Sequence, residues 1–104
     1  MTKAPTTQIP GVYRRKVGDM VVTAIADGFL DGAIDVLRNI RPEDATEILA
    51  ASFRPARRTP VNTFVIHAKD RVCLIETGCG DYMAPTSGRQ RANLEAAGVD
   101  ADDI

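Results

Sequence analysis

Residues 61–76 decide the fold, and they read VNTFVIHAKDRVCLIE. Two runs rich in β-branched and aromatic residues, 61–68 and 72–76, flank the polar residues 69–71, a pattern typical of two strands joined as a β-hairpin. We expect His67, the only histidine in the chain, to be a surface or strand-end residue, because no second histidine or acidic cluster lies at metal-ligand spacing. Cys73 is expected to be a small residue of the core.

A second hairpin is predicted upstream, from residues 12–17 and 20–26 around the turn-forming pair Gly18-Asp19. In the first run Arg14 and Lys16 share one face, which suits an edge strand whose charges discourage pairing with other chains. The second run is apolar on nearly both faces, so we expect it to be buried more deeply.

In the middle of the chain, the residue pattern predicts a loop, a helix and a linker. Asp27-Gly28 is expected to end the second strand, and residues 29–40 to form a loop with one helical turn. A helix is predicted over residues 42–53, because Pro42 is tolerated in a first helical turn and acidic residues follow it. Residues 54–60, with three arginines and two prolines, are expected to be a solvated linker. The apolar residues at helical spacing are Ala45, Ile48, Leu49 and Phe53.

The C-terminal residues predict a last helix and the start of a further element. Residues 89–97 are expected to be helical, with Gly98 as a left-handed C-terminal cap. Asp100 has the character of a helix N-cap, so another element would begin there. We therefore expect a truncated α+β half-domain of order β-β-α-β-β-α over residues 11–104, preceded by a flexible arm over residues 1–10.

The composition excludes several classes of protein. Hydrophobic residues make up 44% of the 104 and charged residues 26%, with a net charge of −1, which is typical of a globular chain. There is no basic excess for nucleic-acid binding and no apolar run of about 20 residues for a membrane span. The N-terminus lacks the apolar segment of a secretory signal, so a cytoplasmic location is expected. Cys73 and Cys79 are then expected to be reduced thiols.

The residues do not form a recognisable catalytic set. One histidine cannot supply a Ser-His-Asp arrangement, and no phosphate-binding or dinucleotide-binding glycine motif is present. Cys73, Cys79 and His67 are not expected to converge on a metal, because they lie at different positions along strands and a loop. Residues 77–81 form a glycine-rich exit from a strand, where layered folds place their sites, but this pattern also occurs in plain turns.

Six segments of the chain nevertheless form a specific series. They are GVYR at 11–14, GDMVVTA at 18–24 with DG at 27–28, TPVNTFV at 59–65, LIETGCG at 74–80, PTSGR at 85–89 and ANLEAAGV at 92–99. In this order they resemble the N-terminal part of metallo-β-lactamase-fold hydrolases. The subgroup that they most resemble is that of methyl parathion hydrolase, near the acyl-homoserine-lactone lactonases.

The resemblance implies an αββα sandwich of two similar halves, of which this chain would be the N-terminal half with a mostly antiparallel or mixed sheet. In that family the metal ligands begin with a His-x-His-x-Asp-His run beyond the position of Ile104. Two divalent metal ions, zinc being expected, activate a hydroxide and polarise the scissile carbonyl or phosphoryl oxygen. The parent would hydrolyse an ester, a lactone or a phosphotriester. The isolated chain, without those ligands, is expected to bind no catalytic metal and to be inactive.

The resemblance also implies a few site residues. The family's strand exit reads Asp-Thr-Gly, and its carboxylate supports the metal-bearing loop; here the exit reads Glu76-Thr77-Gly78. The alternative for Glu76 is an exposed strand-end acid without a role. Phe29, together with Tyr82 and Met83, is a candidate for the wall of a substrate pocket, although the segments that hold them are as well explained as connections.

The expected partners follow from the same interpretation. The missing C-terminal half or a second copy of the chain would cover the sheet, and in the second case the chain would be a homodimer. The parent protein would bind a small-molecule substrate. A different function also stays open: a non-catalytic interaction module, or the product of a decayed gene, that associates through its exposed sheet edge.

Overall fold

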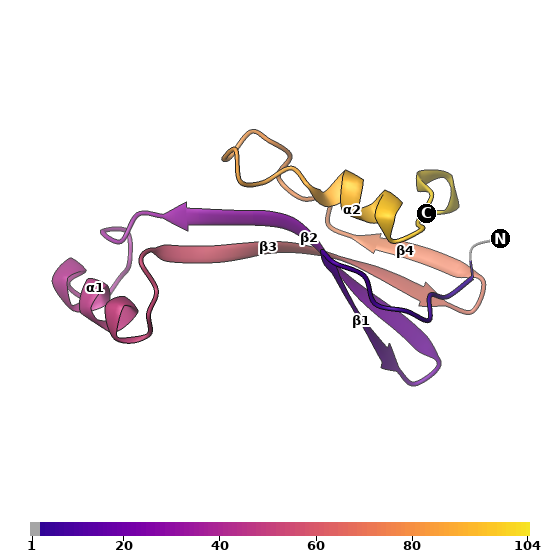
Figure 1. The fold of residues 1–104 in the computed structure, drawn as a ribbon, viewed down its shortest axis with the longest axis horizontal. Helices are drawn as coiled ribbons and strands as arrows, with labels where there is room; N and C mark the ends of the chain where they lie inside the picture. Colours follow the sequence, from indigo (N-terminus) through magenta and orange to yellow (C-terminus); the bar gives the residue numbers. More distant parts are fainter. Residues whose placement is uncertain (1–2) are drawn as a thin grey trace.

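The computed structural model describes residues 3–104, which form one antiparallel sheet with helices at its ends and on one face (Figure 1). The strands follow the order β1-β2-β3-β4 across the sheet. The α+β class and the order β-β-α-β-β-α are therefore confirmed. The elements are β1 (Val12–Val17), β2 (Met20–Gly32), α1 (Pro42–Ala51), β3 (Arg57–Ala68), β4 (Arg71–Ile75), α2 (Gln90–Ala96) and the short 3₁₀ helix η1 (Ala101–Asp103).

Both predicted hairpins are present. In the first, β1 and β2 pair from Val12 opposite Ile25 to Val17 opposite Met20, around a turn in which Gly18 has a φ of +61°. In the second, β3 and β4 pair on either side of a two-residue turn. The first strand is an edge strand, as predicted, because only β2 pairs with it.

The central strands extend further than the sequence indicates. Asp27-Gly28 was expected to end β2, but the strand continues to Gly32, and β3 begins at Arg57. The loop expected at 29–40 and the linker expected at 54–60 are therefore wrong in part. A β-bulge between Ala26 and Gly28 explains the difference, because it absorbs one extra residue and lets pairing resume at Gly28 opposite Val61.

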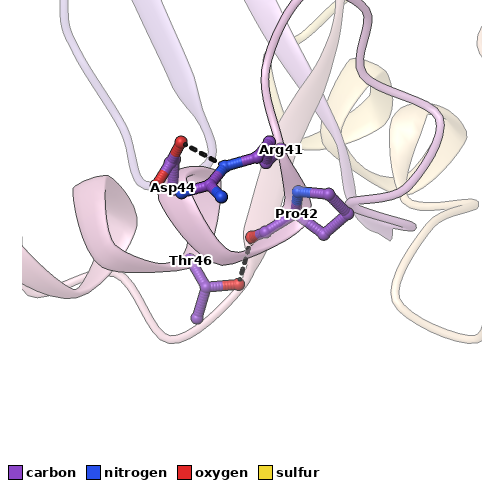
Figure 2. A network of polar contacts seen from close by, with 4 residues as sticks. All are labelled: Arg41, Pro42, Asp44 and Thr46. Carbon is purple, nitrogen blue, oxygen red and sulfur yellow. Dashed lines mark hydrogen bonds and ion pairs between the residues drawn. The ribbon is translucent and has the colours of Figure 1, made fainter.

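The lengthened β2–β3 pair forms an arm that carries α1 at its end, away from the rest of the molecule (Figure 1). The chain is elongated as a result, with dimensions of 52 × 30 × 23 Å. Helix α1 begins at Pro42 as predicted. Its first turn is held by the Arg41–Asp44 ion pair at 3.1 Å and by the Thr46 hydroxyl, which donates to the Pro42 carbonyl at 2.9 Å (Figure 2).

One face of the sheet is covered and the other is open. Helix α2 packs on the covered face, where Val12, Ile25, Val65 and Val99 form the core. Successive side chains of a strand point to opposite faces, so the residues between them lie on the other side. The exposed apolar residues of this open face are Tyr13, Val17, Phe64 and Ile75.

His67 lies near the end of β3, as predicted, but it is not a surface residue, and the prediction that Cys73 belongs to the core is wrong. His67 is only 5% exposed and lies on the covered face, whereas Cys73 is exposed on the open face. The reason is the pleat: His67 shares its face with the core residue Val65, and Cys73 lies between Val72 and Leu74, which pack against the core.

The C-terminal end agrees with the predicted caps. Gly98 follows α2 with a φ of +80°, and the Asp100 carboxylate accepts a hydrogen bond from the Asp102 amide at 2.9 Å. No helix among residues 3–104 combines the length and the apolar character needed to cross a membrane.

Candidate functional site

The candidate site is the place where the loop after β4 returns to the bulge of β2. Asp27 lies at its centre and is 1% exposed. Its Oδ2 accepts hydrogen bonds from the Cys79 amide at 3.0 Å and from the Cys79 thiol at 3.4 Å, while Oδ1 accepts from the Gln90 amide at 3.0 Å. Its backbone carbonyl accepts from the Arg89 amide at 3.0 Å. One residue of β2 therefore holds both the strand-exit loop and the start of α2.

This carboxylate replaces a local helix cap. Arg89, in the N-cap position of α2, makes no capping hydrogen bond with its own side chain. The first amides of a helix need acceptors, and Asp27 supplies one from a distant strand. Helix α2 is therefore positioned by a tertiary contact and not by its own sequence.

Two glycines allow the backbone to approach the carboxylate closely. A Cβ on Gly78 would lie 2.8 Å from Asp27 Oδ2 and 2.7 Å from the side-chain oxygen of Gln90. A Cβ on Gly28 would lie 1.9 Å from the Thr86 carbonyl oxygen. Both glycines also have positive φ angles, +74° and +132°. A larger residue would displace the side chains of Asp27 and Gln90 at Gly78 and the backbone of Thr86 at Gly28.

The charge of Asp27 is stabilised in the folded chain. Burial raises the pKa of its carboxyl, but the hydrogen bonds from Cys79, Gln90 and Gly88 lower it by more. The net pKa lies below the ordinary aspartate value, so the group is a carboxylate at neutral pH.

Hydrogen bonds of Thr86 and Ser87 also fix the loop between β4 and α2 further along the chain. Phe29 donates its amide to the Thr86 carbonyl at 3.1 Å and accepts the Thr86 hydroxyl at its own carbonyl. The Ser87 hydroxyl donates to the Gly80 carbonyl at 2.7 Å. These contacts make the loop a fixed part of the fold next to the bulge.

The structure separates the residues predicted at the strand exit. Gly78 lies against Asp27, but Glu76 and Thr77 are exposed, and Glu76 has a φ of +69°. Asp27 is thus the buried carboxylate here, and the sequence reasoning missed it. The available signal was its position two residues after Ile25, at the end of the mostly apolar run 20–26.

The residues predicted for a pocket wall are also separated. Phe29 is half-buried, and the Arg58 guanidinium lies 4.0 Å from the centre of its ring while pairing with Asp31 at 2.9 Å. Tyr82 is 94% exposed, and Met83 is exposed as well. Phe29 lines a cavity of about 420 Å³ with Phe53, Arg54, Pro55 and Pro60, which does not include Tyr82 or Met83.

The described residues do not fit a metal ion. Within residues 3–104, no three side chains of histidine, cysteine, aspartate or glutamate come close enough together to hold one. Asp27 and Cys79 touch each other, but a structural or catalytic metal needs at least three protein ligands. What this arrangement does chemically is to fix a loop and a helix.

Comparisons with known proteins give the fold a context. Neither a protein-family model nor a curated protein matches the chain. Solved structures do match it. Among them are hydrolase AbOPH of the β-lactamase superfamily, with a TM-score of 0.81 and 24% sequence identity, and the dizinc quorum-quenching lactonase AidC, with a TM-score of 0.79 and 23% sequence identity. They cover 94% and 90% of this chain, but the chain covers only 35% and 33% of theirs. The chain therefore has the fold of about one third of a metallo-β-lactamase-type hydrolase.

Proposed function

We propose that the chain is the N-terminal portion of a metal-dependent hydrolase with the metallo-β-lactamase fold. The observation that supports this most is the fold match at a TM-score of 0.81 across 94% of the chain, against 35% of the hydrolase. Two thirds of such a protein has no counterpart here. That remainder would hold the metals, which supply an activated hydroxide and a Lewis acid.

The contribution of this chain is structural in the proposal. The sheet provides a base for the second half of a sandwich, and Asp27 holds the strand-exit loop that runs from Glu76 to Gln90. Since residues 3–104 do not fit a metal site, no step of the hydrolysis is assigned to them. Within the parent, Glu76-Thr77-Gly78 would face the metal-bearing loop.

The proposed substrates are an ester, a lactone or a phosphotriester. The neighbour AidC is a lactonase in complex with a homoserine product, which supports the lactone. The resemblance to the methyl parathion hydrolase subgroup supports the phosphotriester. All three contain an electrophilic carbonyl carbon or phosphorus atom, whose oxygen a metal pair can polarise.

An activity and metal measurement tests the part of the proposal that concerns the isolated chain. Purified chain is incubated with excess zinc, desalted, analysed for bound metal by mass spectrometry, and assayed against one substrate of each class. We expect no tightly bound zinc and no hydrolysis above the buffer rate. Stoichiometric zinc that survives desalting, or turnover that a chelator abolishes, would contradict the proposal.

The reading frame tests the part that concerns the parent. The nucleotide sequence after the codon for Ile104 is expected to encode a strand followed by a His-x-His-x-Asp-His run. A stop codon at that position, confirmed in the transcript, would rule out the parent hydrolase.

A second candidate function is an interaction module without catalytic activity. The observation in its favour is the open face of the sheet, where Tyr13, Val17, Phe64 and Ile75 are exposed together. Exposed apolar surface of this kind is typical of a binding surface. A stop codon after Ile104 together with self-association of the chain would favour this function.

A further inference from the structure

The Arg14 guanidinium has no counterion among the described residues. By the alternation along β1, Arg14 lies on the covered face together with the core residue Val12. Its Nη2 donates to the Ala97 carbonyl at 3.3 Å, but Nε and Nη1 are out of contact with solvent and have no hydrogen-bond partner within residues 3–104. The ion pairs of the described part of the chain do not include Arg14, and burial lowers the pKa of its guanidinium. A cation that has lost hydration without gaining a partner costs free energy until an anion binds it.

Two further polar side chains lie unpaired beside Arg14. Thr23 is directly opposite it on β2, and the Thr23 hydroxyl is buried without a partner in the described part of the chain. The charge of Arg14 also acts on the ring of His67, which is buried with both nitrogens unpaired among residues 3–104. The described residues themselves shut these atoms off from solvent, so their lack of partners does not follow from where the sequence ends. Because buried polar groups are normally paired, the cluster points to a binding site for a polar ligand.

Arg14 also lines a cavity of about 480 Å³ between β1 and the segment that precedes it. Gln8 fixes this segment against the strand: its side chain donates to the Arg14 carbonyl at 2.8 Å and accepts from the Arg14 amide at 2.7 Å. The wall of the cavity is therefore held in place beside the guanidinium. The charged and hydroxyl-bearing residues of this wall are Thr6, Thr7, Arg14, Arg15, Lys16 and Asp19.

The charge of the cavity wall is positive. Arg14, Arg15 and Lys16 supply three cations, whereas Asp19 is the one carboxylate among the described residues of the wall. An excess of two positive charges matches a dianion. Guanidinium, ammonium and hydroxyl groups are the donors that the oxygens of phosphate and sulfate accept, so the chemistry of the wall matches an oxyanion.

We propose that this cavity binds a tetrahedral oxyanion, either as a free ion or as the phosphate group of a larger molecule. Arg14 is its central ligand and turns Nε and Nη1 toward the anion. The bond that holds the guanidinium to Ala97 is longer than a usual N–H···O distance, so it opposes this rotation only weakly. Lys16, two residues along the same face of β1, supplies the second charge. The oxyanion site does not depend on the proposed hydrolase function, since its ligands lie in β1 and in the segment before it.

Isothermal titration calorimetry of the 104-residue chain with sodium sulfate tests the site. Sodium chloride at the same ionic strength is titrated in parallel, because general screening depends on ionic strength and not on the shape of the anion. We expect one sulfate per chain with a Kd of about 1 mM or lower, and no saturable binding of chloride. Sulfate binding that does not saturate up to about 20 mM, or that is no tighter than chloride binding, would overturn the proposal.

Three variants test the ligands. Arg14→Gln removes the central charge and should weaken sulfate binding about tenfold or more, as the loss of hydrogen bonds from a charged group does. Lys16→Gln changes an exposed residue that the fold does not need, and it should weaken binding about two- to fivefold. Arg71→Gln is the matched control, since it removes the same charge from an exposed strand position outside the cavity and should bind sulfate as the wild type does. Equal affinity in Arg14→Gln and Arg71→Gln would overturn the assignment of Arg14.

The ring of His67 reports on the site without any substitution. Because His67 is the only histidine of the chain, its ring protons and carbons give one unambiguous set of NMR signals. These signals should shift as sulfate is added and saturate at the same Kd as the heat, and they should not shift in this way with chloride. A ring whose signals stay in place while sulfate saturates the chain would show that the anion binds away from Arg14, against the proposal.

Two further titrations distinguish the sources of the oxyanion. Inorganic phosphate and glycerol phosphate are compared under the same conditions. Equal affinity for the two identifies the free ion as the ligand, and tighter binding of glycerol phosphate identifies a phosphorylated molecule. Binding of both that is no stronger than the binding of chloride would exclude an oxyanion site.

Discussion

At the residue scale, Asp27 is the group on which the candidate site depends. It is buried and accepts from the amides of Cys79 and Gln90, so Asp27→Asn leaves an amide NH₂ facing one of these donors. We expect a loss of about 2 kcal/mol in the free energy of unfolding, the usual cost of a mispaired buried group. Urea denaturation measures it. Asp31→Asn, at an exposed carboxylate, is the control and should change stability little.

The same residue predicts part of the acid response. The pKa of Asp27 is lower in the folded chain than in the unfolded chain. The carboxylate therefore contributes its full stabilisation at pH values above the unfolded-state pKa, and this stabilisation is lost as the pH falls through the folded-state pKa. Asp27→Asn should therefore flatten the loss of stability in the acid range. The free energy of unfolding is measured against pH for the wild type and for Asp27→Asn. Equal slopes between about pH 5 and 3 would show that folding does not stabilise the carboxylate.

His67 predicts a second pH dependence at higher pH. Burial, and after it the charge of Arg14, lowers the pKa of its ring below the ordinary 6.5, and neither ring nitrogen has a hydrogen-bond partner among the described residues. The unfolded chain then takes up a proton before the folded chain does, so stability should fall as pH drops below about 6.5. His67→Leu should remove this slope between about pH 6.5 and 5. Urea unfolding at each pH measures the free energy of unfolding. The same dependence on pH in His67→Leu and in the wild type would contradict the prediction.

At the element scale, the bulge of β2 decides where the loop after β4 can lie. Gly28→Ala places a Cβ 1.9 Å from the Thr86 carbonyl, so the loop must move away from Phe29. The expected cost is about 3 kcal/mol or more. Gly18→Ala is the matched control: it shares a positive φ but meets nothing within 4 Å, so it carries only the left-handed penalty of about 1–2 kcal/mol. Thermal unfolding compares them, and similar melting temperatures would refute the clash.

At the scale of the whole molecule, the outer edge of β1 is closed by residues that precede it. The Gln8 side chain donates to the Arg14 carbonyl at 2.8 Å and accepts from the Arg14 amide at 2.7 Å, as a neighbouring strand would. Gln8→Ala removes these two hydrogen bonds and should let the chain associate through β1 more strongly than the wild type does. Light scattering after size-exclusion chromatography is the measurement. Thr7→Ala, at the exposed neighbouring residue, should behave as the wild type does, and a Gln8→Ala protein with the wild-type mass distribution would contradict the prediction.

The sequence by itself determined the elements and their order. The two hairpins and α1 follow from local signals: alternating β-branched runs, turn residues at Gly18, and Pro42 at a helix start. The caps at Gly98 and Asp100 are local in the same way. Such features depend on a few neighbouring residues, so they could be predicted without any knowledge of packing.

Only the tertiary structure decided which face is buried and where the site lies. Residues 72–75 are apolar on both faces, so the exposure of Cys73 and the burial of His67 depended on the side where α2 docks. Asp-Gly is a stop signal locally, but at Asp27 contacts from residues more than fifty positions away turn it into a bulge that binds a loop. Partners so distant in sequence leave no local pattern, because the chain brings them together only when the sheet and α2 pack.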